Sequence, residues 1–297
     1  MIHVANVQKK FGDIEALRGV SLEIGRGERV AFVGSNGSGK TTLLRALVGL
    51  IHVKGRVVID GLDVADHPEL ALQHIAYMPQ IAPPLEAPVG ELVQAAMALR
   101  GKPPTAVALR AAQLGLDYAA ICKTRFRDLS GGMRQKILAA MALASDARIL
   151  VCDEPTANLD PEARAAFFAQ VDALPAEAIV ILCSHRLEEV RQLVDRVVEL
   201  RDGLVLRDMP AQTLLAQMAT NHVEVTLHDE TQATRAWLLR RGFHAMGPRR
   251  VSMACTHAEK LEIVAELVRS HWHEVANLSV PEISKLAIGG GEREVQL

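Results

Sequence analysis

The run Gly34–Thr41 has the residue types and spacing of a phosphate-binding loop. It reads Gly-Ser-Asn-Gly-Ser-Gly-Lys-Thr and fits G-x-x-x-x-G-K-[ST] in full. Glycines let backbone N–H groups converge on phosphate oxygens at a helix N-terminus, where unpaired donors and the dipole favour anions. Lys40 is expected to reach the β- and γ-phosphates of a nucleotide, and Thr41 to bind Mg²⁺. Such a run can also simply close a strand against a helix, but here it follows the apolar strand Arg29–Val33 and precedes helical spacing, the context of a true phosphate loop.

A second group of candidate residues ends an apolar strand. The run Ile149–Asp153 is apolar up to its final carboxylate, and Glu154 follows it. Because the carboxyl ends of strands in open α/β sheets face the ligand crevice, Asp153 is predicted to hold the magnesium shell. Glu154 is then the natural general base for an attacking water. Asp-Glu-Pro is also a common way to leave a strand, but the phosphate loop upstream favours the functional interpretation.

The run Leu129–Met133 contains a second Ser-Gly-Gly element. One bound phosphate chain does not need two glycine cradles. We therefore interpret Ser130, Gly131 and Gly132 as groups that reach a nucleotide held by a neighbouring copy. With one set of site residues per chain, two complete sites require a dimer, which should form with nucleotide and loosen after hydrolysis.

Taken in order, these motifs resemble the ATPases of the ATP-binding cassette (ABC) transporters. The resemblance rests on GSNGSGKTT, LSGGM, ILVCDEP, the run Ala157–Asp160 and Ser184-His185, and it covers roughly residues 2–210. It implies ATP hydrolysis, with ATP and Mg²⁺ as cofactors. The nucleotide-binding residues that it implies are Phe11, Gly34, Ser35, Asn36, Gly37, Ser38, Gly39, Lys40, Thr41, Thr42, Ser130, Gly131, Gly132 and Asp160.

The resemblance also implies individual roles. Gln80 would sense Mg²⁺ and the attacking water and couple them to a membrane partner. Asp160 would bridge subunits, and His185 would bind the γ-phosphate and hold the transition state. Phe11 matches the aromatic that stacks on adenine, where tyrosine is more usual; phenylalanine keeps the stacking face and loses a hydroxyl. The implied catalytic residues are Glu154, His185 and Gln80, and the implied metal ligands are Thr41, Gln80 and Asp153.

The pattern along the chain predicts an α/β fold with two additions. Residues 1–210 are expected to form the nucleotide-binding core, with an antiparallel β subdomain and a helical insert at about 81–135. A linker helix at 211–220 should follow. Residues 221–288 then show the order β-α-β-β-α-β of a small ferredoxin-like α+β domain. A tail at 289–297 begins with three glycines.

Composition narrows the class of protein. At 297 residues and 49% hydrophobic, the chain can bury one core and a second, smaller unit. A net charge of −2 leaves no broad basic surface for nucleic acid, so no nucleic-acid partner is predicted. The start of the chain does not read as a signal peptide, and no run approaches the ~18 apolar residues of a membrane span. Four scattered cysteines suit reduced cytosolic thiols.

The subgroup is indicated by residues 87–92 and by LSGGMRQK, which look most like cassettes of bacterial exporters with a separate membrane chain. That group includes drug, polysaccharide and haem exporters, and the copper-linked transporter used in maturing nitrous oxide reductase, which also carries a small trailing domain. The predicted partners are a second cassette copy and a multi-span permease, at the cytoplasmic face of the plasma membrane. Alternatives are a soluble ABC ATPase that scaffolds cofactor assembly, and an ATP-gated regulator of an envelope protein. Amino-acid-type importers also use separate cassettes.

The C-terminal domain leaves two interpretations open. Its histidines, together with Met246, Met253 and Cys255, suggest a soft-metal site. They lie far apart in sequence, however, and the domain equally fits a packing or dimerisation module. The six histidines are His222, His228, His244, His257, His271 and His273.

Overall fold

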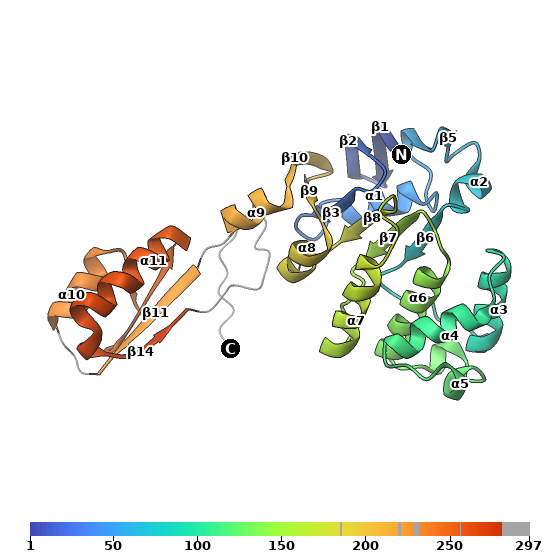
Figure 1. The fold of residues 1–297 in the computed structure, drawn as a ribbon. Helices are drawn as coiled ribbons and strands as arrows, with labels where there is room; N and C mark the ends of the chain where they lie inside the picture. Colours follow the sequence, from blue (N-terminus) through green and yellow to red (C-terminus); the bar gives the residue numbers. More distant parts are fainter. Residues whose placement is uncertain (185, 219–220, 229–231, 256, 281–297) are drawn as a thin grey trace. The chain divides into compact units, whose positions relative to one another are not determined.

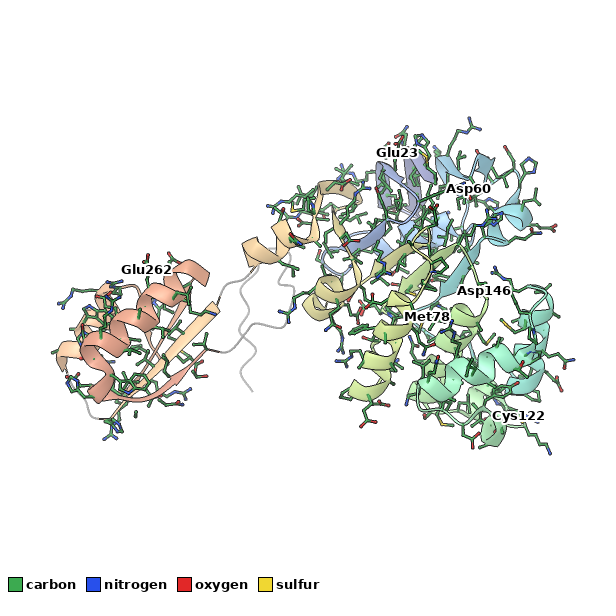
Figure 2. All side chains as sticks on the ribbon, in the orientation of Figure 1. Glu23, Asp60, Met78, Cys122, Asp146 and Glu262 are labelled. Atoms are coloured by element: carbon green, nitrogen blue, oxygen red, sulfur yellow. The ribbon has the colours of Figure 1, made fainter. Side chains whose placement is uncertain are left out.

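The computed structural model describes residues 1–184, 186–218, 221–228, 232–255 and 257–280 (Figure 1). One unit runs over Met1–Ala211, and a second begins at Gln212. Among the described residues, no helix is both long and apolar enough to cross a bilayer. All four cysteines are free thiols; three are buried, and Cys122 is half-exposed at the end of a short helix (Figure 2).

An antiparallel sheet opens the first unit. Its strand order is β2 (Ile14–Ile24), β1 (Ile2–Phe11), β4 (Lys54–Ile59) and β5 (Leu62–Asp63). Ile2 and Val4 point inward while His3 between them is exposed, as expected for a sheet with one solvated face. The buried face packs on the same core as helix α1 (Lys40–Leu47).

A six-stranded sheet forms the centre of the first unit. Its order is β10 (Leu204–Pro210), β9 (Arg196–Arg201), β3 (Arg29–Val33), β8 (Ile179–Cys183), β7 (Ile149–Asp153) and β6 (Ile75–Met78), and every neighbouring pair is parallel except β10 with β9. All residues of β7 and β8 are buried, because both faces of these strands are covered. Parallel strands align their carboxyl ends, so β3, β6, β7 and β8 finish at one edge.

Helices complete the first unit. They are α2 (Pro68–Leu72), α3 (Val89–Ala98), α4 (Pro104–Gln113), α5 (Tyr118–Ile121), a 3₁₀ turn (Phe126–Asp128), α6 (Gly131–Ala144), α7 (Pro161–Asp172) and α8 (Leu187–Leu193). Figure 1 shows α3, α4 and α5 gathered beside α6, away from β1 and β2. Arg100, just after α3, donates to the carbonyl oxygens of Gln73 (2.9 Å) and Ile75 and thereby fixes this helical insert to the start of β6.

The second unit has the predicted ferredoxin-like order. Helix α9 (Ala211–Met218) leads into β11 (Asn221–Leu227), α10 (Gln232–Arg240), β12 (His244–Ala245), β13 (Arg250–Cys255), α11 (His257–Glu266) and β14 (Val275–Ser279). Its sheet is antiparallel, in the order β12-β13-β11-β14. Val225 and Val251 of the sheet pack with Leu238 and Ile263 of the helices. After α11 the chain forms a π turn at Leu267–His271 and a 3₁₀ turn at Trp272–Glu274.

Candidate nucleotide site

The phosphate loop joins β3 to α1 in a space that admits only glycine at both of its ends. A Cβ on Gly34 would lie 2.2 Å from the Leu200 carbonyl oxygen and 2.6 Å from Ser38 Oγ. A Cβ on Gly39 would lie 2.6 Å from the Ala16 carbonyl oxygen, and its φ of +106° is unfavourable for other residues. Backbone crowding therefore requires glycine at positions 34 and 39.

The Lys40 side chain folds back across this loop. Its Nζ donates to the carbonyl oxygens of Gly34 (2.8 Å) and Ser35 (3.0 Å). Helix α1 starts at Lys40 with no side-chain cap and no acidic residue in its first turn. Ser38 Oγ is buried and lacks a hydrogen-bond partner among the described groups. The loop thus presents an ammonium, a hydroxyl and the first amides of a helix together, which is a site for an anion.

The tip of the β9–β10 hairpin closes the other side of the loop. The Gly203 N–H donates to the Ser38 carbonyl oxygen (3.1 Å), and the Gly203 carbonyl accepts from the Arg18 N–H of β2 (2.9 Å). The phosphate loop is therefore held between the two sheets before any ligand binds.

Asp153 lies at the carboxyl end of β7 with only 1% of its surface exposed. Burial raises the pKa of this carboxyl, while a hydrogen bond from Thr41 and the charges of Arg45 and Lys40 oppose the shift. Its Oδ2 has no hydrogen-bond partner in the described part of the chain. An unpaired buried carboxylate oxygen is costly unless a cation satisfies it, and oxygen is the ligand that Mg²⁺ prefers. Asp153 and Thr41 therefore fit the predicted metal site.

Glu154 adopts a backbone conformation that is rare for its residue type. Its φ is +53°, and its N–H donates to the Cys183 carbonyl oxygen at the end of β8 (2.9 Å). Left-handed conformations of residues other than glycine cost free energy and concentrate at functional sites. The conformation turns the chain at the sheet edge directly after Asp153.

A buried carboxylate behind Glu154 was not predicted from the sequence. Glu189 of α8 is 1% exposed and accepts a hydrogen bond from the Thr156 hydroxyl. Burial raises the pKa of Glu189, the hydroxyls of Thr156 and Ser184 lower it, and Glu154 raises it again. This network fixes the segment after Glu154 to the helix that follows residue 185. His185 itself lies outside the described residues.

The Ser-Gly-Gly element begins the 14-residue helix α6. Ser130 is exposed and caps the helix by accepting from the Met133 N–H (3.2 Å). A Cβ on Gly131 would meet nothing within 4 Å, whereas one on Gly132 would lie 3.1 Å from the Asn158 carbonyl oxygen. The Ser-Gly-Gly element therefore exposes the N-terminus of α6 to solvent. Gly132, on the other side of this helix end, lies close to the loop before α7.

Asp160 and Gln80 each follow a strand of the central sheet along the chain. Asp160 caps α7 by accepting from the Ala163 N–H (2.8 Å) and pairs with Lys136 of α6 (2.7 Å), which lowers the pKa of Asp160. Buried Gln135 donates to the Pro155 carbonyl oxygen (2.9 Å) and also fixes α6 to this loop. Gln80 is exposed and follows β6, whose carboxyl end lies beside that of β7.

The remaining predicted residues lie around this edge or beside it. Asn36 and Ser35 are exposed in the loop, Gly37 faces open space, and Thr42 is half-buried in α1. Phe11 is 48% exposed at the end of β1.

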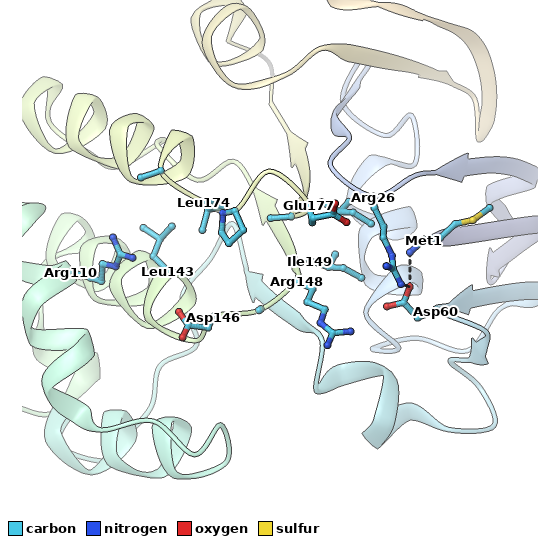
Figure 3. Close-up of a pocket in the computed structure, with 15 residues that line it drawn as sticks. Met1, Arg26, Asp60, Arg110, Leu143, Asp146, Arg148, Ile149, Leu174 and Glu177 are labelled. Atoms are coloured by element: carbon cyan, nitrogen blue, oxygen red, sulfur yellow. Dashed lines mark hydrogen bonds and ion pairs between the residues drawn. The ribbon is translucent and has the colours of Figure 1, made fainter.

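A cavity of about 370 Å³ lies at the other edge of the central sheet (Figure 3). Ile149 and Ile179, the first residues of β7 and β8, line it. Figure 3 shows the Met1 amine directed at Asp60, with which it forms an ion pair at 2.7 Å. Because Asp153 ends β7 at the opposite edge, this cavity is separate from the phosphate loop.

The described residues of the second unit give no support to a metal site. Across the described parts of the chain, no group of three or more His, Cys, Asp or Glu side chains is placed to hold a metal ion. His271 instead bonds through Nδ1 to the buried Thr234 hydroxyl (2.9 Å) and stacks on Trp237 at 4.6 Å. The side chains of His222 and His257 are not described.

Comparisons with known proteins agree with this geometry. A family model described as "ABC transporter" matches residues 17–157. A sulfate/thiosulfate import ATP-binding protein of Burkholderia mallei is 37% identical over 69% of this chain and 61% of its own length. A daunorubicin resistance ATP-binding protein of Streptomyces coeruleorubidus is 31% identical over 91% of this chain and 87% of its own. A dimeric ATP-binding cassette in a post-hydrolysis state, bound to ADP and Pi, superposes with a TM-score of 0.63 at 27% identity, over 71% of this chain and 99% of that one.

Proposed function

The chain belongs to the ABC transporter family of ATP-binding proteins, and we propose that it serves an exporter, as one of two identical ATPase subunits beneath a separate multi-span membrane protein. ATP hydrolysis with ATP and Mg²⁺ is the activity of this family. The observation that carries the proposal is the pairing of one complete phosphate loop with a second helix N-terminus, at Ser130, that faces solvent.

Each site residue then has a definite task. Lys40 and the first amides of α1 bind the phosphates, and Thr41 and Asp153 hold the metal. Mg²⁺, when bound, supplies positive charge against the phosphate oxygens. Glu154 accepts the proton of the attacking water. Gln80 and His185 are proposed to orient that water and to bind the γ-phosphate.

The dimer follows from the exposed end of α6. In the proposed arrangement, Ser130, Gly131 and Gly132 of one copy contact the γ-phosphate held by the other. The ion pair between Lys136 and Asp160 and the bond from Gln135 keep this helix end in register with the segment that follows Glu154. Closure of the two copies is thereby linked to the catalytic carboxylate.

The lengths of the alignments with a daunorubicin resistance protein and an import protein support export. The daunorubicin resistance protein aligns over 280 residues, more than the cassette alone, whereas the import protein aligns over 224. The second unit is proposed to stabilise the dimer through its ferredoxin-like module. The assembly would work at the cytoplasmic face of the plasma membrane.

The test is to capture the closed state with Glu154→Gln. This variant should bind MgATP, hydrolyse it very slowly and co-purify from detergent-solubilised membranes with a second copy and a multi-span protein. Lys40→Ala is the matched control, since it removes a phosphate-binding cation and should recover neither in response to ATP. Recovery of soluble assembly proteins alone would favour the scaffold alternative. A membrane partner whose substrate moves inward would overturn the direction.

A further inference from the structure

Phe11 is held from one side by a lysine two residues earlier in the same strand. The Lys9 Nζ lies 5.0 Å from the centroid of the Phe11 ring. The ring is 48% exposed, whereas Lys9 is half-buried. The ammonium therefore covers part of a ring that still offers surface to a ligand.

The Lys9 ammonium is itself anchored. It donates to the carbonyl oxygen of His52 at 2.8 Å, in the segment between α1 and β4. Lys9 also pairs across strands with Leu17, and a Cβ on Gly39 of the phosphate loop would lie 3.0 Å from Leu17 Cδ2. Lys9 therefore contacts the Phe11 ring and the His52 carbonyl before β4, and its cross-strand partner Leu17 lies beside Gly39 of the phosphate loop.

We propose that Lys9 is a positioning residue for the nucleotide base, which fixes the Phe11 ring through a cation–π contact and leaves the opposite face free for adenine. This inference rests on the proposed stacking of adenine on Phe11. A ring already held in place loses less conformational freedom when a ligand binds. The whole contact between a cation and a half-exposed ring corresponds to about a two- to fivefold change in an equilibrium constant, which is the upper limit of what its loss can do to ATP affinity.

The neighbouring Lys10 provides a matched control. Lys9 and Lys10 line the same open cavity of about 630 Å³, so both contribute positive charge to the same surface. Lys10 makes no ring contact among the described residues. A purely electrostatic effect on the triphosphate would therefore appear in both variants.

The experiment measures ATP and inorganic tripolyphosphate binding by calorimetry for the full chain. Lys9→Met should weaken ATP binding by up to about fivefold and leave tripolyphosphate binding unchanged, because only ATP carries a base. Lys9→Arg should restore ATP affinity, and Lys10→Met should change neither. In a Phe11→Leu background, Lys9→Met should have no further effect.

Three outcomes would overturn the proposal. Equal weakening of both ligands would make Lys9 a general electrostatic contributor. Tighter ATP binding in Lys9→Met would show that the lysine occupies the face that the base needs. Full ATP affinity in Phe11→Leu would show that the Phe11 ring does not contribute to binding of the base. Failure of the proposed function is distinct, because it would appear as the absence of a membrane partner in the co-purification, whereas these binding measurements use the isolated chain.

Discussion

Asp153→Asn should make the ligand-free protein more stable and remove its response to MgATP. The carboxylate is 1% exposed and has an oxygen without a partner among the described groups. Leaving a buried acceptor unpaired costs about 1–3 kcal/mol, and more for a charged group. The isosteric amide keeps a polar atom at that position but removes the charge, so the free energy of unfolding should rise by about 1 kcal/mol, or about 2–4 °C in Tm for a unit of this size.

The pH dependence of this gain has a definite sign. Because burial raises the pKa of Asp153, the folded state binds this proton more tightly than the unfolded state. The corresponding stabilisation is complete below the ordinary value of 3.8 and is lost as the pH rises through the folded-state pKa. The stability of the unmodified protein should therefore fall behind that of Asp153→Asn as the pH increases.

Added MgATP should reverse the order of stabilities. A ligand at one hundred times its Kd stabilises the protein that binds it by about 2.7 kcal/mol, which the variant should not gain. Calorimetric scans without and with MgATP measure the change in Tm of the ligand-free protein and the shift in Tm that MgATP causes. The unfolding transition that shifts with MgATP is that of the first unit. Exposed Asp66→Asn is the control and should behave as the unmodified protein. A ligand-free Asp153→Asn that melts earlier, or one that keeps the MgATP shift, would refute the reasoning.

Other substitutions test other contacts. Gly34→Ala places a methyl 2.2 Å from a carbonyl oxygen of β9, so it should abolish ATP binding and lower Tm; binding retained at the original affinity would contradict the crowding argument. Gln135→Leu leaves the Pro155 carbonyl without its donor, which should cost about 1–3 kcal/mol and reduce turnover more than ATP affinity, as steady-state kinetics and calorimetry would show. Thr234→Val removes the bond to His271 and should destabilise the second unit by about 1 kcal/mol, with the MgATP-induced shift in Tm intact.

The phosphate loop and the Asp153 strand could be predicted because their signals are local. The glycines, Lys40 and Thr41 lie within eight consecutive residues, and an apolar run that ends in a carboxylate indicates a buried strand directly. The order of strands and helices predicted along residues 221–280 is also the observed one, since these elements alternate clearly along the chain.

The unpredicted features depend on partners that lie far away in sequence. Nothing in the sequence around Glu189 indicates that this carboxylate is buried, because its partner Thr156 lies in another loop. The short strand β6 was not predicted, and it exists because β7 pairs with it. Likewise, the contact between Lys9 and the His52 carbonyl joins positions 43 residues apart, which no periodicity reveals.

The crowded tip of the β9–β10 hairpin has a practical consequence for engineering. Hairpin tips on a surface usually tolerate inserted tags or domains. Here Gly203 at the tip is hydrogen-bonded to Ser38 and Arg18. An inserted peptide would break the hydrogen bonds that hold the phosphate loop in place. A fluorescent reporter is therefore better placed away from this hairpin tip.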